Sequence, residues 1–137
     1  MADAPTTHAD HVARGRTAAE HRAWGDAFTA FAAADADAAP LEPGDLQLWA
    51  IAAYLIGHVD TAVDALARAF HAHHDDGNPA AAVRCGFWIF FMLTARGDVA
   101  LAGGWQTRCE RLLASLPAGA AEHGYLLCSA AFRLATV

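Results

Sequence analysis

Apolar residues recur along this chain at intervals of three and four, which is the spacing of one face of an α-helix. One such run contains Trp24, Ala27, Phe28, Phe31 and Ala34. No run alternates between apolar and polar residues, so we expect no strands. Prolines, glycines and polar residues interrupt the helical pattern and predict seven helices, at about residues 8–21, 24–37, 43–56, 59–74, 78–97, 98–116 and 120–135. The pattern therefore predicts an all-α chain.

The fifth of these segments, residues 78–97, is the most apolar part of the chain. Asn78 is a favourable N-cap, Pro79 occupies the preferred first helical position, and Gly97 is suited to the residue just past a helix end. Between Arg84 and Arg96 there are too few residues for a membrane span, which needs about 20. A helix that is apolar on all sides is buried between neighbours. We therefore expect this helix at the centre of a helical stack.

Composition narrows the choice of protein class. The 137 residues carry a net charge of −6, and all nine basic residues are arginine, so no clustered basic face for nucleic acid is predicted. The cysteines at 85, 109 and 128 are too far apart to suggest a disulfide framework and favour reduced thiols in the cytoplasm. Residues 1–7 resemble no signal peptide and are expected to be a flexible lead-in, followed by a single domain over residues 8–137.

The helices form a repeating pattern of pairs. Val59 follows Trp24 by 35 residues and Val99 follows Val59 by 40, and each is followed by alanine three residues later. A small residue recurs seven positions further on, at Ala34, Ala69 and Cys109. This pattern resembles tetratricopeptide-type repeats, whose period is about 34 residues. The resemblance implies an α-solenoid with helix pairs at about 8–37, 43–74 and 78–116, plus a final helix at 120–135. At the small position of the first helix in each pair stand Gly15, Ala50 and, unexpectedly, Phe90.

The segment from RAFHAHHDDGNP to AGAAEHGYLL also resembles the helical-repeat segment of actinobacterial LuxR-type transcriptional regulators and of some adenylate cyclases. This resemblance implies a cytoplasmic regulatory or interaction module. No basic recognition helix like that of the regulators' DNA-binding domain is found in this sequence. The chain is then either a fragment of a longer regulator or a stand-alone repeat protein.

Tetratricopeptide-type repeats bind ligands on a concave groove lined by the first helix of each pair. By register, the resemblance nominates as groove residues Arg16, Glu20, Gln47, Ile51, Tyr54, Arg84, Phe87, Trp88 and Phe91. Aromatic and arginine side chains are the types that most often anchor contacts with a partner. The alternative is that the aromatic side chains only fill the space between adjacent helices.

The final helix suggests a second kind of contact. Its apolar residues cover more than one stripe, although a terminal repeat needs a polar outer face to remain in water. An exposed apolar patch often marks an interface. We therefore expect Tyr125, Leu126 and Phe132 to contact a partner or a second copy in a homodimer, unless the chain was cut from a longer array.

Catalytic chemistry is weakly represented. The HAHHDD run places His71 and Asp75 four residues apart, a spacing that suits a metal, but histidines at a helix end also complement the helix dipole. Ser115 and Ser129 lie outside any nucleophile motif, and no glycine-rich phosphate loop occurs. We predict no catalytic residue, no metal and no cofactor, and leave enzymatic activity open.

Two readings of function remain. The first is a non-catalytic interaction module that binds a protein or peptide or associates with itself, without nucleic acid or membrane. The second is a small-molecule pocket, sensory or catalytic, whose walls would be Trp49, Tyr54, Trp88 and Phe91.

Overall fold

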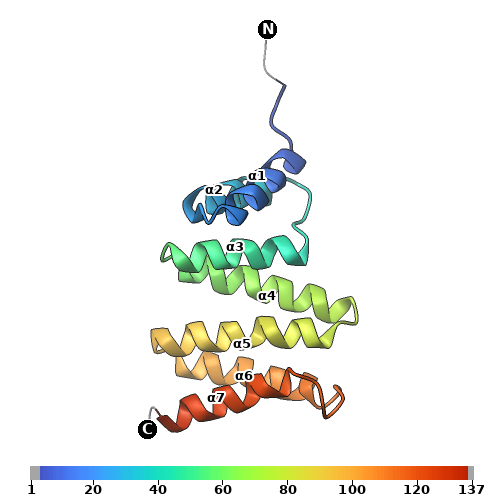
Figure 1. Cartoon of the computed structure of the whole chain (residues 1–137), viewed down its shortest axis with the longest axis vertical. Helices are drawn as coiled ribbons and strands as arrows, with labels where there is room; N and C mark the ends of the chain where they lie inside the picture. The colour runs from blue at the N-terminus through green and yellow to red at the C-terminus, as the bar shows by residue number, and fades with distance from the viewer. Residues whose placement is uncertain (1–3, 136–137) are drawn as a thin grey trace. The chain divides into compact units, whose positions relative to one another are not determined.

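The structure of the protein is a computed structural model that describes residues 4–135. Within that range every regular element is an α-helix, which confirms the predicted all-α class (Figure 1). The predicted and observed bounds agree within three residues. The helices are α1 (His8–Glu20), α2 (Trp24–Ala36), α3 (Pro43–Leu55), α4 (Val59–Asp75), α5 (Pro79–Arg96), α6 (Val99–Leu113) and α7 (His123–Ala135).

Local hydrogen bonds explain where these helices begin and end. Thr7 and Asp10 form a capping box before α1, because each side chain accepts a hydrogen bond from the other residue's backbone N–H. The Asn78 side chain accepts a hydrogen bond from the third residue of α5, and Pro79 occupies the first position. Gly97 ends α5 with φ of 92°, a conformation that glycine adopts at little cost. The start and end predicted for α5 are therefore confirmed.

The described chain divides into two compact units, residues 4–65 and 66–135, and the division falls within the sequence of α4. In the first unit, α2 packs against both α1 and α3. Phe31 is fully buried there, and its ring lies against Gly15 of α1. A Cβ atom at Gly15 would lie 2.8 Å from Cε1 of Phe31, so these helices approach each other closely because position 15 has no side chain.

In the second unit, α5 packs against α6 and α7. The largest fully buried side chains of α5 are Ile89, Leu93 and Val83. Trp88, however, is 47% exposed, so the expectation that this helix is buried on all sides is wrong. A 3.6-residue period gives α5 several faces, and its neighbours leave the face with Trp88 open. Among the described residues no helix is both long and apolar enough to cross a membrane.

Gly86, rather than Phe90, is the small residue at which α5 meets α6. A Cβ atom at Gly86 would overlap the Sγ atom of Cys109 and would lie 3.3 Å from the ring of Phe70. Phe90 is also buried, but as a large side chain that fills the core. The assignment of Phe90 to the small position is therefore corrected. Gly15, Ala50 and Gly86 are each the eighth residue of their helix. The 40-residue spacing between Val59 and Val99 had instead placed the small position at residue 90.

The small residues of the second helix in each pair behave as the repeat pattern predicts. All six are buried, with at most 7% of each residue exposed: Ala27, Ala34, Ala62, Ala69, Ala102 and Cys109. The preceding position is less uniform, because Trp24 and Val59 are half-buried whereas Val99 is 69% exposed. Close helix packing therefore depends on the small residues of the pattern and not on the larger residue that precedes them.

We predict that Gly86→Ala destabilises the second unit by about 1–3 kcal/mol, because the added methyl group overfills the contact with Cys109 and Phe70. Gly103→Ala is the matched control, since a Cβ at this position in α6 meets no atom within 4 Å. It should stabilise the helix by about 0.5–1 kcal/mol. Urea unfolding monitored by circular dichroism measures both, and equal effects of the two substitutions would contradict the packing described.

Candidate functional site

One face of α5 carries four of the predicted groove residues. Arg84, Phe87, Trp88 and Phe91 follow the spacing of a single helix face, and none of them is fully buried. The opposite faces of the helix supply the core of the unit. Helix α7 packs along α5, so part of this face is covered by α7 and part remains open to solvent.

The aromatic rings of α5 and α7 form a continuous row. Ring centroids are 4.7 Å apart for Tyr125 and Phe87, 5.4 Å for Phe87 and Trp88, and 5.9 Å for Trp88 and Phe91. The row ends at Phe132, 6.0 Å from Phe91. All neighbouring rings are tilted or edge-to-face, within the 4.5–7 Å range that favours such pairs. We call these five residues the aromatic row.

The aromatic row joins two predicted sets that the sequence kept separate. Phe87, Trp88 and Phe91 were expected in a groove, whereas Tyr125 and Phe132 were expected at an interface. Trp88 is 47% exposed and the other four are half-buried, so Trp88 is the part of the row most available to a partner. A large exposed aromatic ring that is held by packed neighbours is the usual anchor of a protein interface.

Arg84 lies beside this row but is engaged within the chain. Its Nη1 atom donates a hydrogen bond of 2.8 Å to Oε1 of Glu122, in the turn before α7. The Arg84 side chain is 44% exposed, and that of Glu122 only 13%. The pair therefore ties the start of α7 to α5, and Arg84 has a structural role in addition to any role in binding.

The predicted interface residues of α7 point largely inward. Tyr125 and Phe132 belong to the aromatic row, and Leu126 is half-buried beside a small recess between α5, α6 and α7. Leu127 and Leu134 instead face solvent, with 72% and 81% of each exposed. The sequence places both leucines in the apolar set of the final helix but does not single them out as the exposed ones, because α7 is apolar on several faces and its pattern does not show which face is covered.

The recess beneath α7 is too small for a metabolite. Its volume is about 10 Å³, close to the space of one water molecule. Gln106 and Ser129 are its buried polar residues. The Ser129 hydroxyl donates to backbone carbonyls of α7, while Oε1 of Gln106 has no hydrogen-bond partner. One water molecule there would satisfy the Gln106 carbonyl.

The groove residues predicted in the first unit have different surroundings. Arg16 of α1 forms a two-pronged ion pair with Asp45 of α3, with Nε–Oδ1 and Nη2–Oδ2 distances of 2.7 and 2.8 Å. The Asp45 side chain is only 4% exposed, so this pair joins the two helices. Glu20 is exposed and Ile51 is 45% exposed. Gln47 and Tyr54 are half-buried, and Leu55, one turn after Ile51, is an exposed apolar residue that the sequence reasoning missed.

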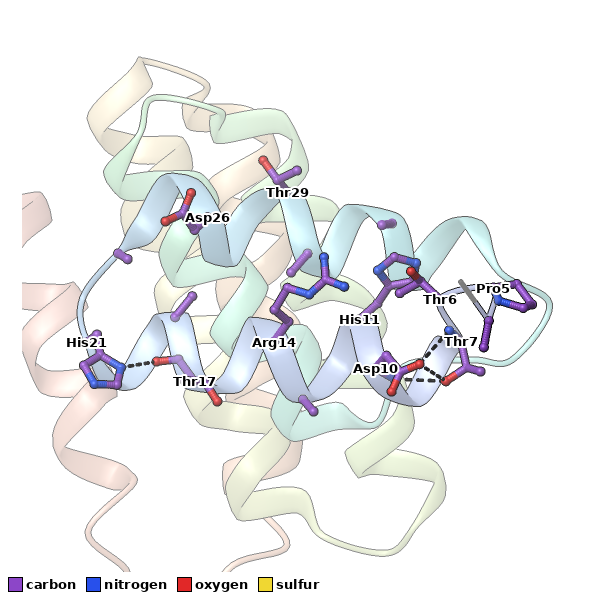
Figure 2. A pocket seen from close by; sticks show the side chains of 16 residues that line it. Pro5, Thr6, Thr7, Asp10, His11, Arg14, Thr17, His21, Asp26 and Thr29 are labelled. Atoms are coloured by element: carbon purple, nitrogen blue, oxygen red, sulfur yellow. Dashed lines mark hydrogen bonds between the residues drawn. The ribbon is translucent and has the colours of Figure 1, made fainter. Parts of the chain in front are cut away.

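Another recess lies in the first unit, between α1 and α2, and is shown in Figure 2. It is an open groove of about 1060 Å³, to which residues 4–7 also contribute. Arg14 and His11 reach from α1 toward α2 in this view, and Asp26 stands at the start of α2. The buried Nδ1 atom of His11 has no hydrogen-bond partner. We call this recess the α1–α2 groove; its alanines and threonines carried no signal that pointed to it.

Two of the three cysteines, Cys85 and Cys109, have thiols that are poorly suited to act as nucleophiles. Burial raises the pKa of Cys85 to about 11 and that of Cys109 to about 11, so both are protonated near neutral pH. Cys128 is exposed on α7.

Among the described residues, no three histidine, cysteine or acidic side chains are grouped so that they could hold a metal ion. In the HAHHDD run, burial is the main cause that lowers the pKa of His73.

Comparison with known proteins gave no match, whether with family models, curated sequences or solved structures.

We predict that the ion pair of Arg16 and Asp45 stabilises the first unit. Arg16→Met leaves the buried Asp45 carboxylate without its partner and should lower the melting temperature clearly. Glu20→Ala on the same helix should leave it almost unchanged, because Glu20 is exposed. Thermal unfolding of both variants is the measurement, and equal melting temperatures would show that the pair contributes nothing.

The raised thiol pKa values also predict how stability depends on pH. The ordinary thiol value is 9.0, below the value of about 11 in the folded protein, so the unfolded chain loses these protons first as pH rises. The stabilisation from the two buried thiols is complete below pH 9 and is lost as pH rises toward 11. Urea unfolding between these pH values should show a steeper loss for the native chain than for the variant Cys85→Ala/Cys109→Ala. Parallel curves would contradict this prediction.

Proposed function

We propose that this chain is a non-catalytic helical-repeat interaction module that binds a peptide or protein segment through the aromatic row. The observation that supports this most directly is Trp88, which is 47% exposed although it packs edge-to-face against both Phe87 and Phe91. Packed neighbours restrict the rotamers of the ring in advance, so binding costs less conformational entropy. The partner segment we propose offers an aliphatic or aromatic side chain to Trp88.

The charges around the row support an apolar contact. Arg84 and Glu122 neutralise each other beside one end of the row, and all five members of the row are aromatic residues. A partner therefore gains mainly from burying apolar area over Trp88 and the open edges of Phe87 and Phe91. The tetratricopeptide-like pattern and the resemblance to LuxR-type regulators and adenylate cyclases lead us to propose a regulatory role in the cytoplasm. The three free cysteines are compatible with such a reducing compartment.

The alternative function, binding of a small molecule inside the helices, has less support. The recess beneath α7 holds about 10 Å³, far below the roughly 300 Å³ at which ligand pockets begin. The α1–α2 groove is larger, at about 1060 Å³, but it is open to solvent and none of the four predicted pocket residues lines it. The peptide selection that tests the interaction module also addresses this alternative, because a chain that binds only a small molecule would enrich no peptide.

We predict that Trp88→Ala abolishes most peptide binding while the protein remains folded. Peptides selected from a random display library on the native chain provide the probe, and calorimetry measures their affinity for each variant. Loss of a central aromatic anchor typically costs about 2 kcal/mol or more, which is roughly a thirtyfold loss of affinity.

Leu101→Ala is the matched control for this measurement. Leu101 is also a large apolar residue, 61% exposed, but it lies on α6 and not in the aromatic row. It should leave the affinity unchanged. The proposal fails if selection enriches no peptide, or if the enriched peptides bind the native chain and the Trp88 variant equally well.

A further inference from the structure

Two side chains of α1, Arg14 and His11, reach into the α1–α2 groove without a partner of their own. Arg14 is exposed and forms no ion pair within the described chain. The carboxylate of Asp10 is held by Thr7, whose backbone N–H and hydroxyl donate to it at 2.9 and 2.8 Å. Those hydrogen bonds are the main cause that lowers the pKa of Asp10, and the charge of Arg14 contributes less. Since Nδ1 of His11 is buried and unpartnered, Nε2 is the ring nitrogen that can contact a ligand.

The opposite wall of the groove carries a negative charge. Asp26 lies in the first turn of α2, is exposed, and has no partner for its carboxylate among the residues that the structure describes. Figure 2 shows it toward the turn between the helices, whereas Arg14 lies near the middle of α1. Arg14 is six residues before the end of α1 and Asp26 two residues after the start of α2. At 1.5 Å per residue the two charges are therefore offset by about 6 Å along the groove.

This offset matches the geometry of an extended peptide. Side chains two residues apart in an extended chain point to the same side and lie about 6.6 Å from each other. An extended backbone also has unpaired N–H and C=O groups, which the exposed hydroxyls of Thr17 and Thr29 on the two walls can bind. The Thr29 hydroxyl already donates to the Gly25 carbonyl, so its oxygen is left to accept from a peptide N–H.

The size and the alanines of the groove also suit a peptide. Its volume of about 1060 Å³ is at the upper end of the range for small-molecule pockets, and it is open to solvent. Between the charged residues it is lined by small side chains, of which Ala30 is buried and Ala18 and Ala33 are half-buried. Alanine side chains let the backbone of a ligand approach both helices closely. An open groove of this kind fits a segment of chain better than a metabolite that must be enclosed.

We propose that the α1–α2 groove binds an extended peptide segment that carries an acidic and a basic residue two positions apart. The acidic side chain accepts hydrogen bonds from Arg14 and from Nε2 of His11, and the basic side chain pairs with Asp26. The groove lies within the first unit and shares no residue with the aromatic row. This second peptide site therefore goes beyond the function proposed above, and either one can fail without the other.

The expected affinity is low, because ion pairs between exposed groups contribute little and are screened by salt. We expect a dissociation constant on the order of 1 mM for a short peptide. Loss of one charge of the peptide should weaken binding about threefold, and a reversed charge in the groove about tenfold.

The first test is a nuclear magnetic resonance titration of the isotope-labelled full chain with defined peptides whose ends are blocked. AAEAKAA and AAKAEAA present the two charges in the two chain directions, and at least one of them should shift the amide signals of the residues that line the groove. AAQAKAA and AAEAQAA each lack one charge and should bind more weakly. AAEKAAA and AAEAAAKAA place the charges one and four residues apart and should also bind more weakly, because only the two-residue spacing fits the offset in an extended chain.

The second test exchanges charges between the groove and the peptide. Arg14→Glu should weaken binding of the preferred peptide, but should bind AAKAKAA more tightly than the native chain does. Asp26→Lys should in the same way gain affinity for AAEAEAA. Both positions are exposed, so the variants should keep the circular dichroism spectrum of the native chain. Arg22→Glu is the matched control, since Arg22 is an exposed arginine of the same unit that does not line the groove, and it should leave the affinity unchanged.

Each contrary outcome overturns the inference. If no peptide shifts the groove signals at about 5 mM, the groove does not bind such a segment. Equal binding of the peptides that lack one charge shows that Arg14 and Asp26 are not read. Tightest binding of AAEAAAKAA shows that the ligand is helical and not extended. Trp88→Ala should have no effect, and loss of binding in this variant would place the peptide on the aromatic row instead.

Discussion

The close approach of paired helices at positions without a side chain underlies the rest of this structure. Gly15 lets α1 meet the ring of Phe31, and Gly86 lets α5 meet Cys109 and Phe70. A methyl group at either position would push the helices apart, and the buried alanines that follow along the second helices would lose contact. Helix α5 meets α6 through Gly86 on one side, and Phe87, Trp88 and Phe91 lie on another face of the same helix.

Helix α5 uses this second face for a different contact. Its inner residues form the core with α6, while Phe87, Trp88 and Phe91 continue into the rings of α7. The ion pair between Arg84 and Glu122 fixes the start of α7 on the same face. The helix that partly covers the aromatic row is therefore also the one that completes it. Trp88 remains half exposed because α7 shields its neighbours more than it shields Trp88.

Helix α7 has two apolar sides that suit different contacts. The inner side belongs to the aromatic row, for which we propose a peptide partner. On its outer side Leu127 and Leu134 face solvent, with 72% and 81% of each exposed. The side of α7 that covers α5 and the side that faces solvent therefore carry different residues.

Local patterns in the sequence were sufficient for the helices themselves. Helical periodicity, together with caps such as Asn78 and stops such as Gly97, placed all seven segments within three residues, because these signals act over only a few neighbouring residues. The sequence also nominated aromatic residues of α5 through the repeat register, and those of α7 because its apolar residues cover more than one stripe of the helix. It could not show that Tyr125 and Phe132 join Trp88 in one row, nor that Leu127 and Leu134 face solvent. A helix that is apolar all round has no preferred face of its own, and only the packing of its neighbours decides which side is buried. The same reason explains Arg16 and Arg84: as residues in a sequence they resemble ligand contacts, whereas the folded chain brings Asp45 and Glu122 from distant segments to pair with them.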